Sequence, residues 1–194
     1  QTKIDMFATF PENIELGEEI AEDYVANDMY EEAKTLAEAL LLTTPGNKNL
    51  ENIIYECVEA LGGDMLGFLK TKYEKDPTDI SNAQLYGEQL LAVGETSLAI
   101  SVYEGVLTVA PELTNVMKKL VQGYGEIGKT KSVISMLKKL NTLQSDDISI
   151  YFDMTEAYIN DGQLKSAMTW AGKAINMDKS NGQAYDNRAS VYEA

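Results

Sequence analysis

Apolar residues recur at steps of three and four along most of the chain, which is the spacing of one face of an α-helix. Within residues 80–110, for example, one apolar stripe runs from Ala83 to Leu90 and a second runs from Ala99 to Val106. Gly94 separates the two stripes. Because glycine adopts backbone conformations that other residues resist, the pattern predicts two helices joined by a tight turn.

This helix–turn–helix pattern repeats along the sequence with a period of 34 residues. Gly94, Gly128 and Gly162 follow one another at that interval, and four prolines are spaced 34, 32 and 34 residues apart, at Pro11, Pro45, Pro77 and Pro111. Proline cannot continue a helix, so each proline marks the end of a second helix. The sequence therefore predicts repeats at 14–47, 48–79, 80–113, 114–147 and 148–181.

The two ends of the chain are expected to hold parts of further repeats. Residues 1–13 are interpreted as the tail of a preceding repeat or an N-terminal cap, and residues 182–194 as the start of a further repeat. The repeat at 48–79 is two residues short, and the deficit lies after Gly62, in its second helix. A single array over residues 1–194 follows from this reading.

The repeated pattern resembles the tetratricopeptide repeat family over nearly the whole chain. The family's signature of small, aromatic and proline positions is matched best at Ala83, Tyr86, Gly87, Leu90, Ala99, Tyr103 and Pro111. The resemblance implies an all-α fold, a right-handed superhelical solenoid of antiparallel helix pairs. It also implies a non-catalytic protein–protein interaction module with a peptide-binding groove.

The stretch "GYGEIGKT", Gly123 to Thr130, matches the pattern of a phosphate-binding loop. Such a loop must follow a buried strand, so that backbone N–H groups at the next helix face the phosphates. The residues before Gly123, "ELTNVMKKLV", have helical spacing instead, and Gly128 is explained by the 34-residue period. We therefore interpret the match as coincidental, and expect no nucleotide or other cofactor.

Composition narrows the chemistry further. Histidine is absent and Cys57 is the only cysteine, which removes histidine-based catalysis, imidazole metal sites and internal disulfides. We expect Cys57 to be inert core, and the sequence predicts neither an enzyme nor a metal site. No apolar run approaches the roughly 18 residues of a membrane span. A cytoplasmic location is the default expectation; because the chain begins at Gln1, a removed leader and an exported or periplasmic location stay open.

The net charge of −15 is unevenly distributed. Residues 1–79 hold 18 Asp and Glu against 6 Lys, a net charge of −12, and the rest of the chain has a net charge of −3. Such a balance repels nucleic acid and attracts a basic protein or peptide. The alternative interpretation is that the acidic surface only keeps the protein in solution.

The resemblance implies that the first helices line a concave face. The residues that face this groove are the second, fifth, ninth and twelfth of each repeat. The candidate partner-binding residues at these places are Glu18, Glu22, Asn52, Glu56, Gln84, Glu88, Leu91, Lys118, Gln122, Phe152 and Glu156. Lys118 is the only cation among them, so the set of basic and amide residues with which some family members clamp a carboxyl terminus is absent. Apolar anchors such as Leu91 and Phe152 would supply affinity, and the carboxylates specificity.

Three functional hypotheses remain at this point. The first is a scaffold that binds a partner protein or peptide in its concave face. The second is a self-assembling scaffold, a homo-oligomer whose exposed ends stack end to end. The third is the interaction region of a larger multidomain protein.

Overall fold

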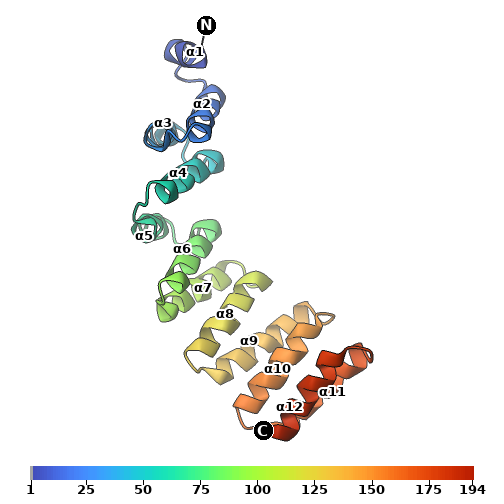
Figure 1. The fold of residues 1–194 in the computed structure, drawn as a ribbon. Helices are drawn as coiled ribbons and strands as arrows, with labels where there is room; N and C mark the ends of the chain where they lie inside the picture. The colour runs from blue at the N-terminus through green and yellow to red at the C-terminus, as the bar shows by residue number, and fades with distance from the viewer. Residues whose placement is uncertain (1) are drawn as a thin grey trace. The chain divides into compact units, whose positions relative to one another are not determined.

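The computed structural model describes residues 2–194, and in this range the chain consists of helices joined by short turns (Figure 1). The chain is 78% helical, and the described residues include no strand, which confirms the all-α prediction. The helices are α1 (Lys3–Thr9), α2 (Ile14–Ala26), α3 (Tyr30–Thr43), α4 (Lys48–Ala60), α5 (Met65–Lys75), α6 (Ile80–Ala92), α7 (Thr96–Val109), α8 (Thr114–Glu126), α9 (Thr130–Leu143), α10 (Ile148–Asn160), α11 (Leu164–Met177) and α12 (Gly182–Glu193).

The even-numbered helices are the first helices of the predicted repeats, and the odd-numbered helices from α3 onward are the second. Side chains cap five of the first helices: Asn13, Asn47, Asp79, Asp147 and Asn181 each accept a hydrogen bond from a backbone N–H in the first turn. Such caps satisfy N–H groups that have no partner within the helix. Short polar side chains therefore define where each of these helices begins.

The turns between the two helices of a pair need a left-handed backbone. Gly62, Gly94, Gly128 and Gly162 have φ values of 66°, 82°, 70° and 71°. The predicted turns at these glycines are confirmed. Asp28 takes the same role between α2 and α3, with φ of 60°, because aspartate is one of the few other residues that tolerate this region.

The chain forms two compact units, an N-terminal unit (Gln1–Phe68) and a C-terminal unit (Leu69–Ala194). The division falls inside α5, which has 11 residues where α3, α7, α9 and α11 have 14. The sequence indicates a shortened second helix after Gly62. The boundary between the two units lies within this same helix. Each unit has its own core.

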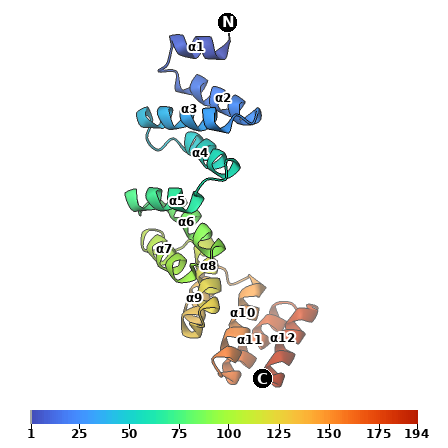
Figure 2. The ribbon, with the colours of Figure 1, turned by 60° about the vertical axis from the view of Figure 1, so that its left-hand side comes forward.

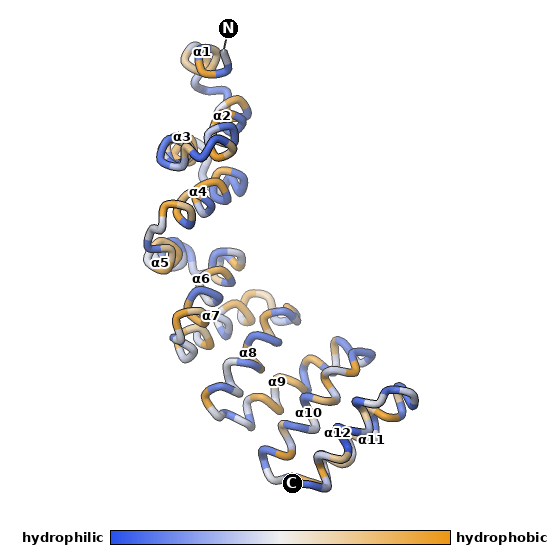
Figure 3. The backbone as a smooth tube through the Cα atoms, in the orientation of Figure 1, coloured by the Kyte–Doolittle hydropathy of each residue, from blue (hydrophilic) through white to orange (hydrophobic). Residues whose placement is uncertain are grey.

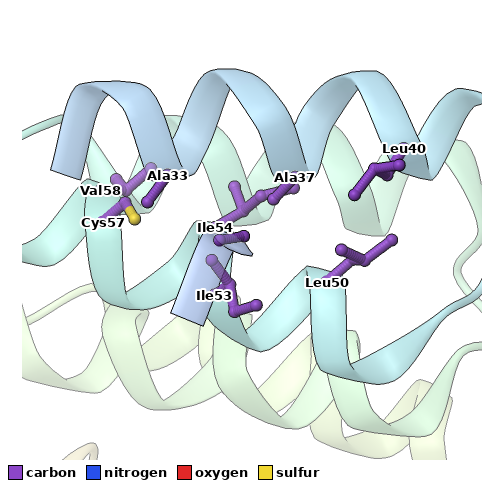
Figure 4. Packing of buried hydrophobic residues seen from close by; sticks show 9 residues of the cluster. Ala33, Ala37, Leu40, Leu50, Ile53, Ile54, Cys57 and Val58 are labelled. Carbon is purple, nitrogen blue, oxygen red and sulfur yellow. The ribbon is translucent and has the colours of Figure 1, made fainter. Parts of the chain in front are cut away.

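The core of the N-terminal unit lies mainly between α3 and α4 (Figure 4). Ala33, Ala37 and Leu40 of α3 face an apolar stripe of α4 that includes Ile54 and Cys57. Ala33 and Ala37 are fully buried, and their small side chains let the two helices approach closely. Cys57 is fully buried too, as expected for an inert core residue, and this burial raises the pKa of its thiol.

In the C-terminal unit, successive helices from α6 to α12 pack against their neighbours, and Figures 1 and 2 both show α10, α11 and α12 side by side. At Gly87 of α6 the two helices of one pair approach closely: a Cβ there would lie 2.6 Å from the ring of Tyr103 on α7. Hydrophobic and hydrophilic residues alternate along each helix (Figure 3). One face of each first helix is thus committed to packing, and the other can carry function.

The turn at Gly128 provides a test of the backbone requirement. We expect Gly128→Ala to lower the free energy of unfolding by about 1–2 kcal/mol, because a Cβ is disfavoured at φ of 70°. The matched control is Gly125→Ala, in the last turn of α8, where a Cβ would meet no atom within 4 Å. There, alanine should leave stability unchanged or raise it by up to about 1 kcal/mol. Chemical denaturation monitored by circular dichroism measures both changes, and equal effects would contradict the turn argument.

Candidate partner-binding site

Every predicted partner-binding residue lies on a first helix and is exposed or half-buried. Glu18 and Glu22 lie on α2, Asn52 and Glu56 on α4, Gln84, Glu88 and Leu91 on α6, Lys118 and Gln122 on α8, and Phe152 and Glu156 on α10. Residues three or four positions apart share one face of a helix. The members of each helix's set therefore point to the same side.

In the N-terminal unit, polar contacts join the predicted faces of α2 and α4. The amide group of Asn49 donates to carboxylate oxygens of Glu18 and Glu22, at 2.9 and 3.0 Å. Asn47, the cap of α4, also donates to Glu18, at 2.5 Å. The structure thus brings the two α2 carboxylates against the start of the next first helix.

In the C-terminal unit, a similar set of contacts joins α6 and α8. The amide of Asn115 donates to the amide oxygen of Gln84 at 2.6 Å, and the ammonium of Lys119 lies 3.2 Å from a carboxylate oxygen of Glu88. Exposed pairs of this kind contribute little to stability, about 0–1 kcal/mol. Their main effect is to hold the polar side chains of α6 and α8 next to each other on one surface.

Lys118, the only cation in the predicted set, has a carboxylate partner. Its ammonium lies 3.0 Å from an oxygen of Asp147, the residue that caps α10. Hydrogen bonds from Ser149, and then the contact with Lys118, hold the pKa of Asp147 below its usual range. Lys118 is therefore neutralised locally, and sequence reasoning missed this partner because Asp147 lies 29 residues away and serves as a helix cap.

A hollow of about 230 Å³ lies between α8, α9 and α10 in the C-terminal unit. It brings together two predicted residues, Gln122 and Glu156, and adds Glu126 and Asp153. Sequence reasoning missed these two carboxylates as site residues. Helical spacing could have found them, because Glu126 follows Gln122 by four positions and Asp153 precedes Glu156 by three. Hydrogen bonds orient Glu126, which accepts from Gln122 at 3.0 Å.

Among the residues that line this hollow, Asp153 has a raised pKa. Burial by the surrounding protein, followed by the negative charges of Glu156 and Asp147, raises the pKa of its carboxyl group. The side chain still reaches solvent, so the effect of burial on its charge is partial. A carboxylate that is disfavoured by its neighbours gains most from an approaching positive charge. A positive charge in the hollow would therefore be electrostatically favoured.

Other kinds of site find less support in the described residues. Within residues 2–194, no group of three or more His, Cys, Asp and Glu side chains is arranged to hold a metal ion. No helix in the same range is both long and apolar enough to cross a lipid bilayer.

The stretch "GYGEIGKT" forms the end of α8, a turn and the start of α9. Gly123 to Glu126 are helical, Gly128 occupies the left-handed turn, and Thr130 opens the next helix. A helix precedes the motif where a phosphate-binding loop needs a strand. The helical interpretation of this segment is confirmed.

A nucleotide titration tests the same point in solution. We expect no binding of ATP or GTP with magnesium by isothermal titration calorimetry, because the backbone geometry that cradles phosphates is missing. Lys129→Ala should change the free energy of unfolding by less than about 0.5 kcal/mol, because Lys129 is exposed in the turn. Micromolar affinity that this substitution removes would contradict our interpretation.

The raised pKa of Asp153 predicts a pH-dependent stability change. Because its pKa is higher in the folded chain than in the unfolded chain, its ionisation costs stability as the pH rises through the folded-state pKa. We therefore expect Asp153→Asn to raise the melting temperature at neutral pH, and the gain to vanish below the unfolded-state pKa of about 3.9. Glu112→Gln, in an exposed turn, controls for the loss of one charge. A gain that is constant with pH would contradict the assignment.

Comparisons with known proteins rest on the fold. No protein-family model matches the sequence, and no curated protein matches it. The solved structure of MamA is 17% identical, with a TM-score of 0.67, covering 89% of this chain and 96% of that one. YrrB, a tetratricopeptide-repeat protein with an unusual peptide-binding site, is 9% identical with a TM-score of 0.68, covering 97% and 98%.

A third solved structure extends the same likeness. TTC0263, a thermophilic tetratricopeptide-repeat protein of Thermus thermophilus, is 20% identical with a TM-score of 0.53, covering 93% of this chain and 100% of that one. The similarity spans nearly the full length of all three structures. Together with the 34-residue period and the helix pairs, it shows that this chain has the fold of tetratricopeptide-repeat proteins.

Proposed function

We propose that the chain is a non-catalytic scaffold that binds a basic segment of a partner protein or peptide on the face formed by its first helices. The observation that carries this proposal is the hollow of the C-terminal unit, where Glu126, Asp153 and Glu156 surround about 230 Å³ of open space. Lys118, the only cation of the predicted set, is already paired with Asp147. Among the residues that the structure describes, the hollow is thus lined by three carboxylates and by no cation.

The chemistry of the hollow favours a lysine or arginine side chain of the partner. Arginine can donate a fork of N–H groups to two carboxylate oxygens at once, whereas lysine binds as a compact charge. Either cation would offset the mutual repulsion of Asp153 and Glu156 and would lower the raised pKa of Asp153. Binding should therefore release a proton when the pH lies near that pKa.

Apolar contacts are needed as well, because exposed ion pairs supply little affinity. Phe152 neighbours Asp153 on α10 and is half-buried, which leaves part of its ring accessible. Leu91 is half-buried on α6, in the same unit. We propose that such residues anchor apolar side chains of the partner, while the carboxylates select for positive charge.

The N-terminal unit supports the same preference for a basic partner. Glu18 and Glu22 lie on one face of α2, and Glu56 lies exposed on α4. The structural likeness to YrrB adds general support, because that protein has a peptide-binding site on the same fold. In this chain, binding of a peptide remains our proposal.

Peptides selected from a displayed library against the 194-residue chain test the proposal. We expect the selected peptides to be enriched in Lys or Arg beside an apolar residue, and their affinity to fall as salt rises. The double variant Asp153→Lys with Glu156→Lys should weaken binding by about tenfold or more, because it replaces attraction by repulsion in the hollow. Isothermal titration calorimetry measures the affinity.

The matched control reverses two charges outside the first helices, with Glu112→Lys and Asp146→Lys. Both residues are exposed in turns between helices, so the net charge changes equally while the hollow stays intact. Equal losses in the two double variants would show that only the overall charge matters. Salt-independent binding that survives reversal at Asp153 and Glu156 would overturn the proposal.

A further inference from the structure

A second hollow of the C-terminal unit is lined by lysines. This lysine-lined hollow has a volume of about 310 Å³ and lies between α9, α10 and the turn that joins α10 to α11. Lys131, Ser135 and Lys138 enter it from one face of α9, because they follow one another at steps of four and three positions. The helices that flank α9 and α10 along the chain, α8 and α11, are both present, so the hollow lies inside the repeat array.

The lysine-lined hollow collects hydrogen-bond donors that have no acceptor. Within residues 2–194, the ammonium groups of Lys131 and Lys138 have no ion-pair partner. In the same range, the hydroxyl groups of Ser135 and Tyr158 form no hydrogen bond. Tyr158 is only 7% exposed, so packing of its ring holds the hydroxyl in place. Two ammonium groups and two hydroxyl groups are therefore ready to donate to one ligand.

Positive charge dominates this part of the surface. Residues 127–144, which include α9, hold four Lys and no Asp or Glu, in a chain whose net charge is −15. Asp161 is the one carboxylate in the described lining of the hollow, and it already accepts a hydrogen bond from the side chain of Gln163. An anion is therefore attracted to the lysine-lined hollow, although the chain as a whole is acidic.

The preceding repeat has the same arrangement with a different charge. Three lining positions keep their residue type across the two repeats: Ile100 and Ile134, Ser101 and Ser135, and Tyr124 and Tyr158. The other two positions on the second helix differ, because Lys131 and Lys138 stand where the preceding repeat has Ser97 and Glu104. The two repeats thus differ mainly in whether the place beside the tyrosine is acidic or basic.

This difference indicates which chemical group the lysine-lined hollow lacks. In the preceding repeat, the carboxylate of Glu104 accepts a hydrogen bond from the hydroxyl of Tyr124. One repeat later, the ammonium of Lys138 lies 5.8 Å from the ring centroid of Tyr158, and an ammonium group cannot accept a hydrogen bond. The tyrosine has lost its acceptor, and positive charge has been gained beside it. A carboxylate from outside the chain would satisfy both.

We propose that the lysine-lined hollow binds a carboxylate on an acidic side chain of a partner protein. Lys131 and Lys138 neutralise the carboxylate, and Ser135 and Tyr158 donate hydrogen bonds to its oxygens, which are strengthened by its charge. Both lysines and Ser135 are exposed, so the hollow is open to a side chain on another protein. Sites for free small ligands usually enclose most of the ligand instead.

This site goes beyond the proposed function, because it takes a ligand of the opposite charge. The lysine-lined hollow and the hollow around Asp153 and Glu156 have no lining residue in common. Either proposal can therefore fail without the other.

A nuclear magnetic resonance titration of the 194-residue chain with a short peptide that carries two glutamates among neutral residues tests the site. We expect shift changes in the backbone amides to be confined to residues 131–138 and 158–163. Lys131→Gln with Lys138→Gln should weaken binding by about tenfold, because both ammonium groups are lost. The matched control, Lys129→Gln with Lys139→Gln, removes the same charge from exposed lysines outside the hollow. Equal losses in the two double variants would overturn the proposal.

Two single variants distinguish a built site from a positively charged surface. Lys138→Glu copies the preceding repeat, so its own carboxylate should accept from Tyr158 and abolish peptide binding without lowering the melting temperature. Tyr158→Phe keeps every charge and should weaken binding by about two- to tenfold, the effect of one lost hydrogen bond. Unchanged affinity in either variant would overturn the proposal.

Three further probes identify the source of the anion. The same peptide with glutamine in place of glutamate should not bind. Inorganic phosphate and glutarate should bind at least about tenfold more weakly than the glutamate peptide, because the open hollow does not enclose them. Either small anion binding as tightly as the peptide would assign the hollow to a free ligand and overturn the proposal.

Discussion

Close contact between neighbouring helices, within each pair and between successive pairs, is the constraint on which the rest of the structure depends. Small residues make it possible: within the pair α6 and α7, Gly87 lies against the ring of Tyr103, and between successive pairs Ala33 and Ala37 are fully buried where α3 meets α4. A larger side chain at such a place would force the helices apart, because packed interiors have little room to adjust. With one face of each first helix held in this contact, its opposite face is left to polar residues.

That division of faces explains why many carboxylates lie on the first helices but contribute little to the stability of the fold. Their contacts with neighbours, such as Glu88 with Lys119, are exposed and contribute little to folding. Asp153 is the exception, because its neighbours disfavour its charge. Binding surfaces commonly contain an ionised group that its own surroundings destabilise and that an opposite charge on the partner would stabilise.

On α2, carboxylates and apolar residues lie on opposite sides of the helix. Glu18 and Glu22 belong to the predicted partner-binding face, whereas Ile20 and Tyr24 line an apolar hollow with α1 and α3. This arrangement follows from helical periodicity, because residues two positions apart point to different sides.

Part of the candidate site could be predicted from the sequence, and part could not. The register of the repeats identified which residues lie on the first helices, because each register position depends only on local helical geometry. The pairing of Lys118 with Asp147 depends on how α8 and α10 pack, and no local signal encodes it. Helical spacing puts Glu126 beside Gln122 and Asp153 beside Glu156, but only the packing of α8, α9 and α10 brings these residues to one hollow.

The sequence by itself determined the helices, their turns at Gly62, Gly94, Gly128 and Gly162, and the tetratricopeptide-like period. These features follow from side-chain spacing and from the backbone freedom of single residues, which are properties of short segments. Only the tertiary structure decided which charges are neutralised, where the division inside α5 separates two compact units, and which apolar residues stay uncovered. Those outcomes depend on contacts between residues about 30 or more positions apart, whose energies are set by distance and burial in the folded chain.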